Sequence, residues 1–353
     1  MVKYVLGIDA SKKDIHVCLS VIDLRQQVKV KATSKFSNST QGFKGLVSWL
    51  NRYTKESDVP LVSVIEATGV YYESCALFLY NAGFDVAVVL PNKAKKYLQA
   101  LGLRSKNDKI DATGLARMGA EQCLELWQPM DEFFFTLRAL TRHHQSLQEL
   151  RTNVNNQLHA EEHSIYSIKS VIKQHKKLIA TIEEQLKEIE QRIHDHLNNN
   201  AEVAEKINHI TAIKGLGYMT VATILAETNG FLLFKSISQL TSYAGYDVIE
   251  DQSGSHKGKT KISKKGNKRI RRALHMPALN MIRYEVGSFK PFFERILKRH
   301  NQKMKAYVAV QKKLLGIIYT LWKRNEAFIS DVQNHLSGNV ETVPSFALAQ
   351  GPK

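Results

Sequence analysis

The stretch KYVLGIDASKKDIHVCLSV, residues 3–21, decides the fold of the N-terminal part of the chain. Its two apolar runs, 3–8 and 15–21, flank the tight polar turn DASKKD, which predicts a pair of strands. A third strand, alternating and more polar, is predicted around residues 27–36. Asp9 stands where the first strand meets its turn, so we expect a carboxylate there at one edge of a sheet.

Strands and helices alternate beyond this hairpin. The patterns predict a helix at 41–54, a strand at 61–67, a helix at 71–83, a strand at 85–91 and two helices from residue 92 onward. The order βββαβαβα implies a mixed sheet with helices on both faces. It is the order expected of a ribonuclease-H-like fold, in which the first strand carries an Asp at its end.

Three more acidic residues join Asp9 in this pattern. Glu66, in VIEATG, ends the second apolar strand, and Asp108 and Asp111, in SKNDKIDA, lie about one helical turn apart. Carboxylates near a core are costly unless a positive charge lies between them. Two divalent cations about 3.5–4 Å apart would supply that charge and a phosphoryl-transfer site, and oxygen ligands favour Mg²⁺ or Mn²⁺. Each carboxylate alone could be a surface or helix-capping group, Asp108 in particular.

The composition suits a globular protein of two or three domains. The chain has 353 residues, 43% of them hydrophobic, and no apolar run near the roughly 18 residues that span a membrane. The N-terminus lacks a signal-peptide pattern. An odd number of scattered cysteines predicts a reducing cytoplasm without disulfides or a zinc cluster; they are Cys18, Cys75 and Cys123.

Nearly all of the net charge of +17 lies in one C-terminal stretch. Residues 256–313 hold 18 Lys and Arg against two acidic residues, whereas the rest of the chain is almost balanced. A nucleic acid is the natural partner, with a membrane surface or a merely soluble lysine-rich face as alternatives.

A heptad pattern occupies the middle of the chain. Residues 133–197 contain no Gly or Pro, and apolar positions recur at steps of three and four with His175 filling one gap. This predicts a coiled coil or a long helical hairpin, with the seam as a protein–protein contact or as packing on its own domain. His175 then sets the register rather than binding a ligand. The seam residues are Ile165, Ile168, Ile172, Ile179, Ile182, Leu186, Ile189 and Ile193.

A second compact domain, mainly helical, is predicted from about residue 207. Helix, Gly-rich turn and helix are followed by a loop-like stretch at 245–266, and then by basic helical patterns at 268–281 and 292–322. The expected domains are 1–130 (catalytic), 131–205 (oligomerisation helices) and 206–332 (C-terminal), with a disordered tail at 333–353.

Two segments of this second domain could contact phosphate. Ser253 lies in the cationic stretch QSGSHKGKTKISKKGNKRIRRAL, 252–274, either as a nucleophile that nearby Lys and Arg activate or as a turn residue of a phosphate-binding loop. In KGLGYMTVATILAE, 214–227, a Gly-x-Gly turn before a helix presents backbone N–H groups to a phosphate, or is simply a tight turn.

These motifs together resemble a known family. GIDASK, VIEATG and DKIDA resemble the DEDD, RuvC-like domain of the transposases of the insertion-sequence family numbered one hundred and ten. IKGLGYMTVATILAE, FKSISQLTSYAGYD, QSGS and ISKKGNKRIRRAL resemble the C-terminal transposase domain of that family. The resemblance covers roughly residues 3–325 in the family's order, and the chain is also similar to the Piv DNA invertases.

The resemblance implies a Mg²⁺-dependent, RNA-guided DNA recombinase that excises and inserts its own mobile element. Asp9, Glu66, Asp108 and Asp111 would bind Mg²⁺, and Ser253 would form a 5′-phosphoserine link. The sequence QSGS departs from the commoner Ser-Ser-Gly-Gly, so Ser255 is a rival nucleophile. A structured bridge RNA would pair with donor and target DNA, and the coiled coil would form dimers and tetramers in a bacterial cytoplasm.

The residues expected to hold nucleic acid are basic or lie in the Gly-x-Gly turn: Lys214, Gly215, Gly217, Lys257, Lys264, Lys265, Lys268, Arg269, Arg271 and Arg272. Two alternatives from other classes stay open. One is a metal-dependent junction nuclease in which water attacks. The other is a non-catalytic protein that bridges nucleic acids.

Overall fold

A computed structural model describes residues 2–56, 58–102, 107–250, 252–253, 256–257 and 261–328, without the side chains of 252, 256 and 257. The chain divides into two compact units, Met1–Pro129 (unit 1) and Met130–Lys353 (unit 2), each described here by itself. Within the described ranges, no helix is both long and apolar enough to cross a membrane.

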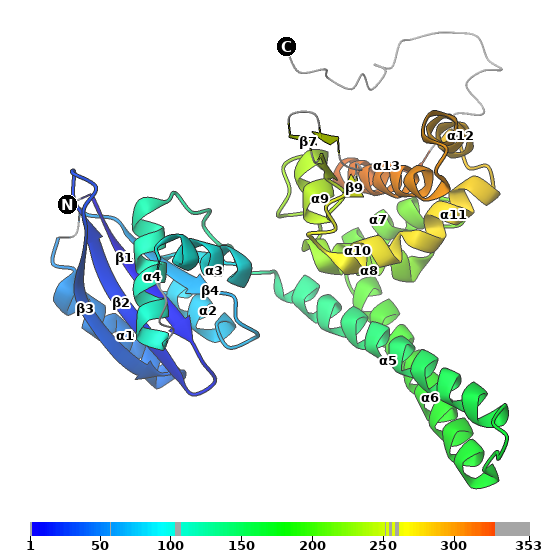
Figure 1. Cartoon of the computed structure of the whole chain (residues 1–353), viewed down its shortest axis with the longest axis horizontal. Helices are drawn as coiled ribbons and strands as arrows, with labels where there is room; N and C mark the ends of the chain where they lie inside the picture. The colour runs from blue at the N-terminus through cyan, green and yellow to red at the C-terminus, as the bar shows by residue number, and fades with distance from the viewer. Residues whose placement is uncertain are drawn as a thin grey trace. The chain divides into compact units, whose positions relative to one another are not determined.

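Unit 1 is built on a five-stranded mixed sheet (Figure 1). Its strands are β1 (Lys3–Ala10), β2 (Asp14–Ile22), β3 (Val28–Ser37), β4 (Leu61–Glu66) and β5 (Asp85–Val89). Their order in the sheet is β3-β2-β1-β4-β5. The first three strands pair antiparallel, and β1, β4 and β5 pair parallel. This confirms the mixed sheet and the ribonuclease-H-like strand order predicted from the sequence.

Helices cover both faces of this sheet, as the alternation of side chains in β1 requires. Tyr4, Leu6 and Ile8 pack on one face with the apolar residues of α1 (Thr40–Tyr53) and α2 (Glu73–Asn81). Val5 packs on the other face with residues of α3 (Pro91–Ala100) and α4 (Asp108–Glu121).

Gly7 lets α4 lie directly on β1. A β carbon added at Gly7 would overlap the carbonyl oxygen of Ala112 and would lie 2.9 Å from the α carbon of Ala116. No side chain therefore fits between strand and helix at this point. The contact sets the position of the first turn of α4, which carries Asp108 and Asp111.

Unit 2 begins with a helical hairpin, α5 (Glu132–Glu162) and α6 (Lys169–Asn198), which lie side by side (Figure 1). From Ile182 onward the predicted seam is buried in the core of its own unit, so the hairpin alternative holds there and the prediction of an interchain contact was wrong for that half. Ile165 and Ile168 precede α6 and are 91% and 54% exposed, so they are not part of a helical seam. Helix–helix contact between chains stays a prediction for this exposed end.

One hydrophobic core joins this hairpin to the remaining helices of unit 2. These are α7 (Ala201–Thr211), α8 (Tyr218–Thr228), α9 (Ile237–Tyr243), α10 (Lys268–Ala273), α11 (His275–Arg283), α12 (Phe289–His300) and α13 (Lys303–Arg324). They confirm the mainly helical character predicted for this region. The predicted tail, 333–353, lies outside the described residues.

The described residues of the stretch 245–266, which the sequence predicted to be loop-like, include four short strands. Strand β6 (Val248–Ile249) pairs with β9 (Lys261–Ile262), and β7 (Gln252–Ser253) pairs with β8 (His256–Lys257). Each strand has only two residues, too few for an alternating pattern to reveal it in the sequence.

Each unit contains a tryptophan whose contacts the structure describes. The Trp127 backbone N–H donates to the carbonyl oxygen of Val86 on β5 at 2.6 Å, and the ring meets Tyr80 edge to face. Near the end of α13, Trp322 packs in the core of unit 2 against Phe231.

Candidate active site

Asp9 and Glu66 lie at the same edge of the unit 1 sheet. β1 and β4 pair parallel with Ile8 opposite Ile65, so the residue that follows each lies at the same level. Parallel neighbours bring their carboxyl ends to one edge, which is what the sequence predicted for these carboxylates. The Thr68 hydroxyl donates to Oε1 of Glu66 at 2.8 Å and orients it.

Asp108 and Asp111 come to this edge from the first turn of α4. The side chain of Asn107 caps the helix and accepts a hydrogen bond from the N–H of Ile110 at 2.8 Å. The alternative of Asp108 as the cap is therefore wrong, and its carboxylate faces the site instead.

The pKa of Asp9 shows that the four carboxylates act on one another. Burial, the largest influence, and then the charges of Asp108, Asp111 and Glu66 together raise this pKa from 3.8 to about 6, whereas the charge of His16 lowers it. A carboxyl group surrounded in this way is stabilised in its protonated form. The predicted acidic set is thus brought together around Asp9.

His16 is a member of the site that the sequence did not single out. It pairs directly with Asp9 across β1 and β2, and its Nδ1 lies 3.0 Å from Oδ2 of Asp108. The sequence did contain a signal for His16. The turn 11–13 joins two antiparallel strands, and their register places His16 opposite Asp9.

The donor set fits a divalent cation by its chemistry. Carboxylate oxygens are the ligands that Mg²⁺ and Mn²⁺ prefer, and a cation would offset the repulsion that raises the pKa of Asp9. Within the described ranges, no three His, Cys, Asp or Glu side chains already converge closely enough to hold one ion. The four carboxylates would therefore have to move closer together when a cation binds.

Ser253 lies in unit 2, on the two-residue strand β7 opposite His256, and it is exposed. Its role as a nucleophile stays a prediction. The rival nucleophile Ser255, and Gly254 before it, lie outside the described residues.

The basic residues predicted to bind nucleic acid take different positions in the structure. Lys264, Lys265 and Lys268 are exposed, and the side chain of Lys257 lies outside the described part. Arg271 donates from Nη1 to the carbonyl oxygen of Ala244 at 2.7 Å, an internal contact that the sequence did not predict. Arg269 and Arg272 take part in ion pairs with carboxylates, as described below.

The Gly-x-Gly turn is shaped largely by packing. Gly215 has a φ of +90°, and a β carbon there would lie 2.8 Å from the β carbon of Asn280. Gly217 caps the N-terminus of α8 with open space around it. Lys214 is exposed, with its ammonium group over the ring of Tyr284. The tight-turn alternative accounts for Gly215, and phosphate binding by Lys214 and Gly217 stays a prediction.

The strand order and the acidic residues at one edge of the sheet define unit 1 as a ribonuclease-H-like domain. Residues 6–165 match the DEDD_Tnp_IS110 family model, described as a transposase. Residues 207–294 match a second model, Transposase IS116/IS110/IS902 family. The chain belongs to this family of transposases, which confirms the resemblance found in the sequence.

Relatives match over most of their length. The chain is 30% identical over 333 residues to the pilin gene-inverting protein of Moraxella bovis, across 93% of this chain and 98% of that protein. It is 21% identical over 315 residues to the transposase for insertion sequence element IS1111A of Coxiella burnetii, across 80% of this chain and 85% of that protein. Thermus thermophilus RuvC is a weak structural match, with a TM-score of 0.28 and 11% identity over 35% of this chain and 99% of that one.

Proposed function

We propose that this chain is a Mg²⁺-dependent, RNA-guided DNA recombinase that excises and inserts a mobile element, with Ser253 as its nucleophile. The observation that carries the proposal is the position of Asp108, Asp111 and Glu66, which lie near enough to Asp9 for their charges to raise its pKa. Membership of a transposase family and two relatives named as a gene-inverting protein and a transposase support DNA as the substrate.

The chemistry is a transesterification. The Ser253 oxygen attacks a DNA phosphorus, the new O–P bond forms, and the P–O3′ bond breaks. The serine hydroxyl gives up its proton and the leaving 3′ oxygen takes one up, so the step is balanced, and the 5′-phosphate stays on the serine. Asp9, Glu66, Asp108 and Asp111 would hold a divalent cation, which would supply positive charge to the scissile phosphate. Exposed Lys264, Lys265 and Lys268 would hold the backbone.

RNA guidance rests on charge and on the family resemblance. Residues 256–313 carry 18 Lys and Arg against two acidic residues, enough for extended contact with phosphate backbones. A structured RNA that pairs with donor and target DNA would use part of this surface, and self-association into dimers or tetramers would bring two donor and target strands together.

A covalent-adduct assay tests the nucleophile. Purified protein with its copurifying RNA is incubated with Mg²⁺ and labelled DNA that spans an element end, then denatured and separated on a gel. A DNA-linked protein band that disappears in Ser253→Ala and Asp9→Asn, but persists in Ser255→Ala, supports the proposal. A band that persists in Ser253→Ala overturns the assignment of the nucleophile.

A second candidate is a junction nuclease in which water attacks. The observation that favours it is that the acidic edge is assembled from residues of unit 1 alone, without Ser253. It predicts cleaved DNA with free 5′-phosphates and no linked band, with full activity in both serine variants.

A further inference from the structure

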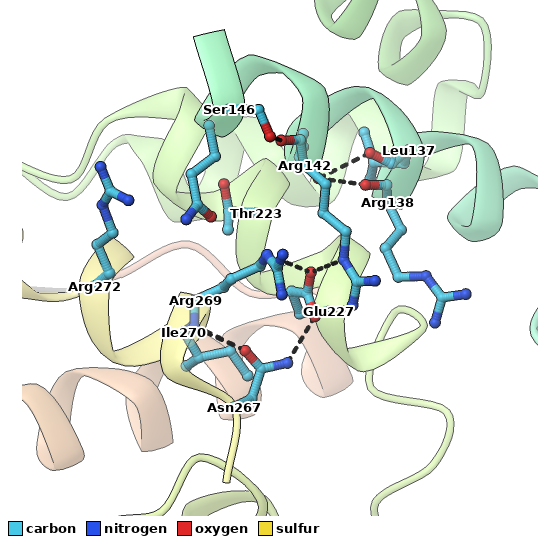
Figure 2. A network of polar contacts seen from close by, with 12 residues as sticks. Leu137, Arg138, Arg142, Ser146, Thr223, Glu227, Asn267, Arg269, Ile270 and Arg272 are labelled. Atoms are coloured by element: carbon cyan, nitrogen blue, oxygen red, sulfur yellow. Dashed lines mark hydrogen bonds and ion pairs between the residues drawn. The ribbon is translucent and has the colours of Figure 1, made fainter. Parts of the chain in front are cut away.

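A buried carboxylate lies at the centre of a polar network in unit 2. The side chain of Glu227, near the end of α8, is only 1% exposed. Arg142 of α5 binds it with two hydrogen bonds, Nε to Oε1 at 2.7 Å and Nη2 to Oε2 at 2.9 Å (Figure 2). A charge buried this deeply requires such pairing, and the two-point geometry fixes the plane of the guanidinium.

A second arginine and an amide share the same carboxylate. Asn267 donates from Nδ2 to Oε2 of Glu227 at 2.7 Å, and Nε of Arg269 lies 3.9 Å from Oε1. Burial, the largest influence, raises the pKa of Glu227, but these hydrogen bonds and positive charges lower it overall. Glu227 is therefore ionised at neutral pH, yet it faces two guanidinium groups with a single negative charge.

Two further arginines lie on the same helix faces. Arg138 is four residues before Arg142 on α5, and Arg272 is three residues after Arg269 on α10, so each pair shares a face. Figure 2 shows Arg142 and Arg269 pointing toward Glu227, with Arg138 and Arg272 at opposite margins of the view. Arg272 pairs with Glu149, and Arg138 lies over the ring of Phe135 at 5.2 Å. We call these four residues the arginine cluster.

The arginine cluster has positive charge in excess and remains accessible. It carries four positive charges, and three of its guanidinium groups pair with the two carboxylates of Glu227 and Glu149. The side chains of Arg142, Arg269 and Arg272 are 41%, 31% and 51% exposed. Nε of Arg269 is buried with no hydrogen-bond partner in the described part of the chain. An internal ion pair with Glu227 alone would need one arginine, whereas two meet this carboxylate.

The same network includes the residues on either side of the segment 244–266, which carries Ser253. The backbone N–H of Asn267 donates to the carbonyl oxygen of Tyr243 at 2.8 Å, and the Tyr243 hydroxyl donates to that of Glu227 at 3.1 Å. Asn267 also caps α10 through the N–H of Arg269. Helix α10 therefore starts where the serine-bearing segment ends, and both are tied to Glu227.

We propose that the arginine cluster is a binding site for the DNA phosphodiester backbone, with Glu227 as the positioning residue that presents Arg142 and Arg269. The proposal rests on the proposed function, because DNA that reaches Ser253 has to approach the segment that this network anchors. Planar guanidinium groups held in fixed orientation suit phosphate oxygens, which they bind in pairs. It adds α5, which was not among the expected nucleic-acid contacts, to the DNA-binding surface.

Salt-dependent binding tests the proposal without any catalysis. The full-length protein is titrated by fluorescence anisotropy against a labelled duplex that spans an element end, in EDTA and at several salt concentrations. Each lost phosphate contact should lower the slope of log K against log salt by about 0.9. We expect that loss in Arg138→Gln and Arg272→Gln, whose side chains are not bonded to the buried carboxylate.

Arg192→Gln is the matched control, since Arg192 is 65% exposed and pairs with Glu188 on the hairpin helix α6. Its slope should equal that of the wild type. Glu227→Gln should also lower the slope. If Glu227→Gln lowered the melting temperature and left the slope unchanged, Glu227 would have a structural role alone. Slopes that match the wild type in Arg138→Gln and Arg272→Gln would overturn the proposal.

An RNA arm separates the two nucleic acids. The same titration with a labelled RNA hairpin should give equal slopes for the wild type and the arginine variants. A loss for RNA without a loss for DNA would overturn the DNA assignment. The failure of the covalent-adduct assay would leave these slopes unaffected, because binding in EDTA needs neither Ser253 nor a cation.

Discussion

Gly7 on β1 and Ala112 on α4 meet backbone to backbone, with no room for a β carbon between them. Gly7→Ala should therefore push α4 away from the sheet and destabilise the protein by about 2 kcal/mol or more, because backbone atoms cannot move aside as a flexible side chain can. Chemical denaturation followed by circular dichroism measures the change.

Gly45→Ala is the control for this substitution. Gly45 lies within α1, and a β carbon there would meet only the Phe36 ring at ordinary distance, 3.5 Å. Because alanine favours a helix, this variant should be neutral or more stable by about 0.5–1 kcal/mol. Equal losses in the two variants would contradict the close contact between β1 and α4.

The raised pKa of Asp9 makes stability fall as pH rises. The folded protein holds a proton on Asp9 up to about pH 6, whereas the unfolded chain releases it near 3.8. In that window the native state binds more protons at Asp9, so without a divalent cation the contribution of Asp9 to the free energy of unfolding should fall by about 2–3 kcal/mol between pH 4 and 7. Asp9→Asn should lose this component and be more stable than the wild type at pH 7.

Asp14→Asn controls for loss of a carboxylate nearby, since Asp14 pairs with Lys35 on the neighbouring strand. Urea denaturation at each pH in EDTA gives the comparison. A wild-type protein whose stability tracks that of Asp9→Asn at every pH would show that Asp9 titrates normally.

A divalent cation should reverse the instability of the acidic edge. Mg²⁺ or Mn²⁺ bound by the four carboxylates stabilises only the folded state, by about 2.7 kcal/mol at one hundred times the dissociation constant. We expect a rise in melting temperature with added Mg²⁺ that EDTA abolishes, present in Asp14→Asn and much smaller in Asp9→Asn. Identical shifts in both variants would place the cation elsewhere.

Glu227→Gln should destabilise the protein more than the loss of any exposed ion pair would. It leaves Arg142 and Arg269 without the charge that holds them, and breaking a buried pair costs about 3–5 kcal/mol. Because Arg142 is 41% exposed and can turn to water, we expect about 3 kcal/mol. Glu188→Gln, which breaks the exposed pair with Arg192, should change the unfolding free energy by less than about 1 kcal/mol.

The acidic edge and Ser253 belong to different units, which allows one protomer to supply each. If they are shared, a mixture of Asp9→Asn and Ser253→Ala proteins should recover part of the covalent adduct that each lacks alone. The adduct assay on separate and mixed proteins measures this. No recovery, with both variants folded and able to bind DNA, would mean that each chain uses its own pair.

The sheet and its acidic edge could be predicted because local patterns encode both. Alternation from Tyr4 to Ile8 fixes which side chains face each helix layer, and parallel pairing then places Asp9 beside Glu66. The approach of α4 to this edge depends on a tertiary contact at Gly7, where the sequence shows only a glycine in a strand.

Glu227 could not be found in this way. It ends an apolar helical pattern, ILAET, where a glutamate is ordinarily a solvated residue, and its partners Arg142 and Asn267 lie 85 and 40 residues away. Periodicity reports which face of a helix is apolar, but it carries no information on which distant cation will meet a buried acid. The prediction of an interchain contact along α6 was wrong from Ile182 onward for a related reason. The heptad pattern specifies an apolar partner, but not whether that partner belongs to the same chain.

The placement of the tryptophans gives the protein built-in optical probes. Trp49 and Trp127 lie in unit 1 and Trp322 in unit 2, and these are the chain's three tryptophans. Trp322→Phe would leave emission from unit 1 alone, and the double change Trp49→Phe with Trp127→Phe would leave it from unit 2 alone. The melting of each unit could then be followed separately within one intact polypeptide, and the cooperativity between them read directly from two fluorescence curves.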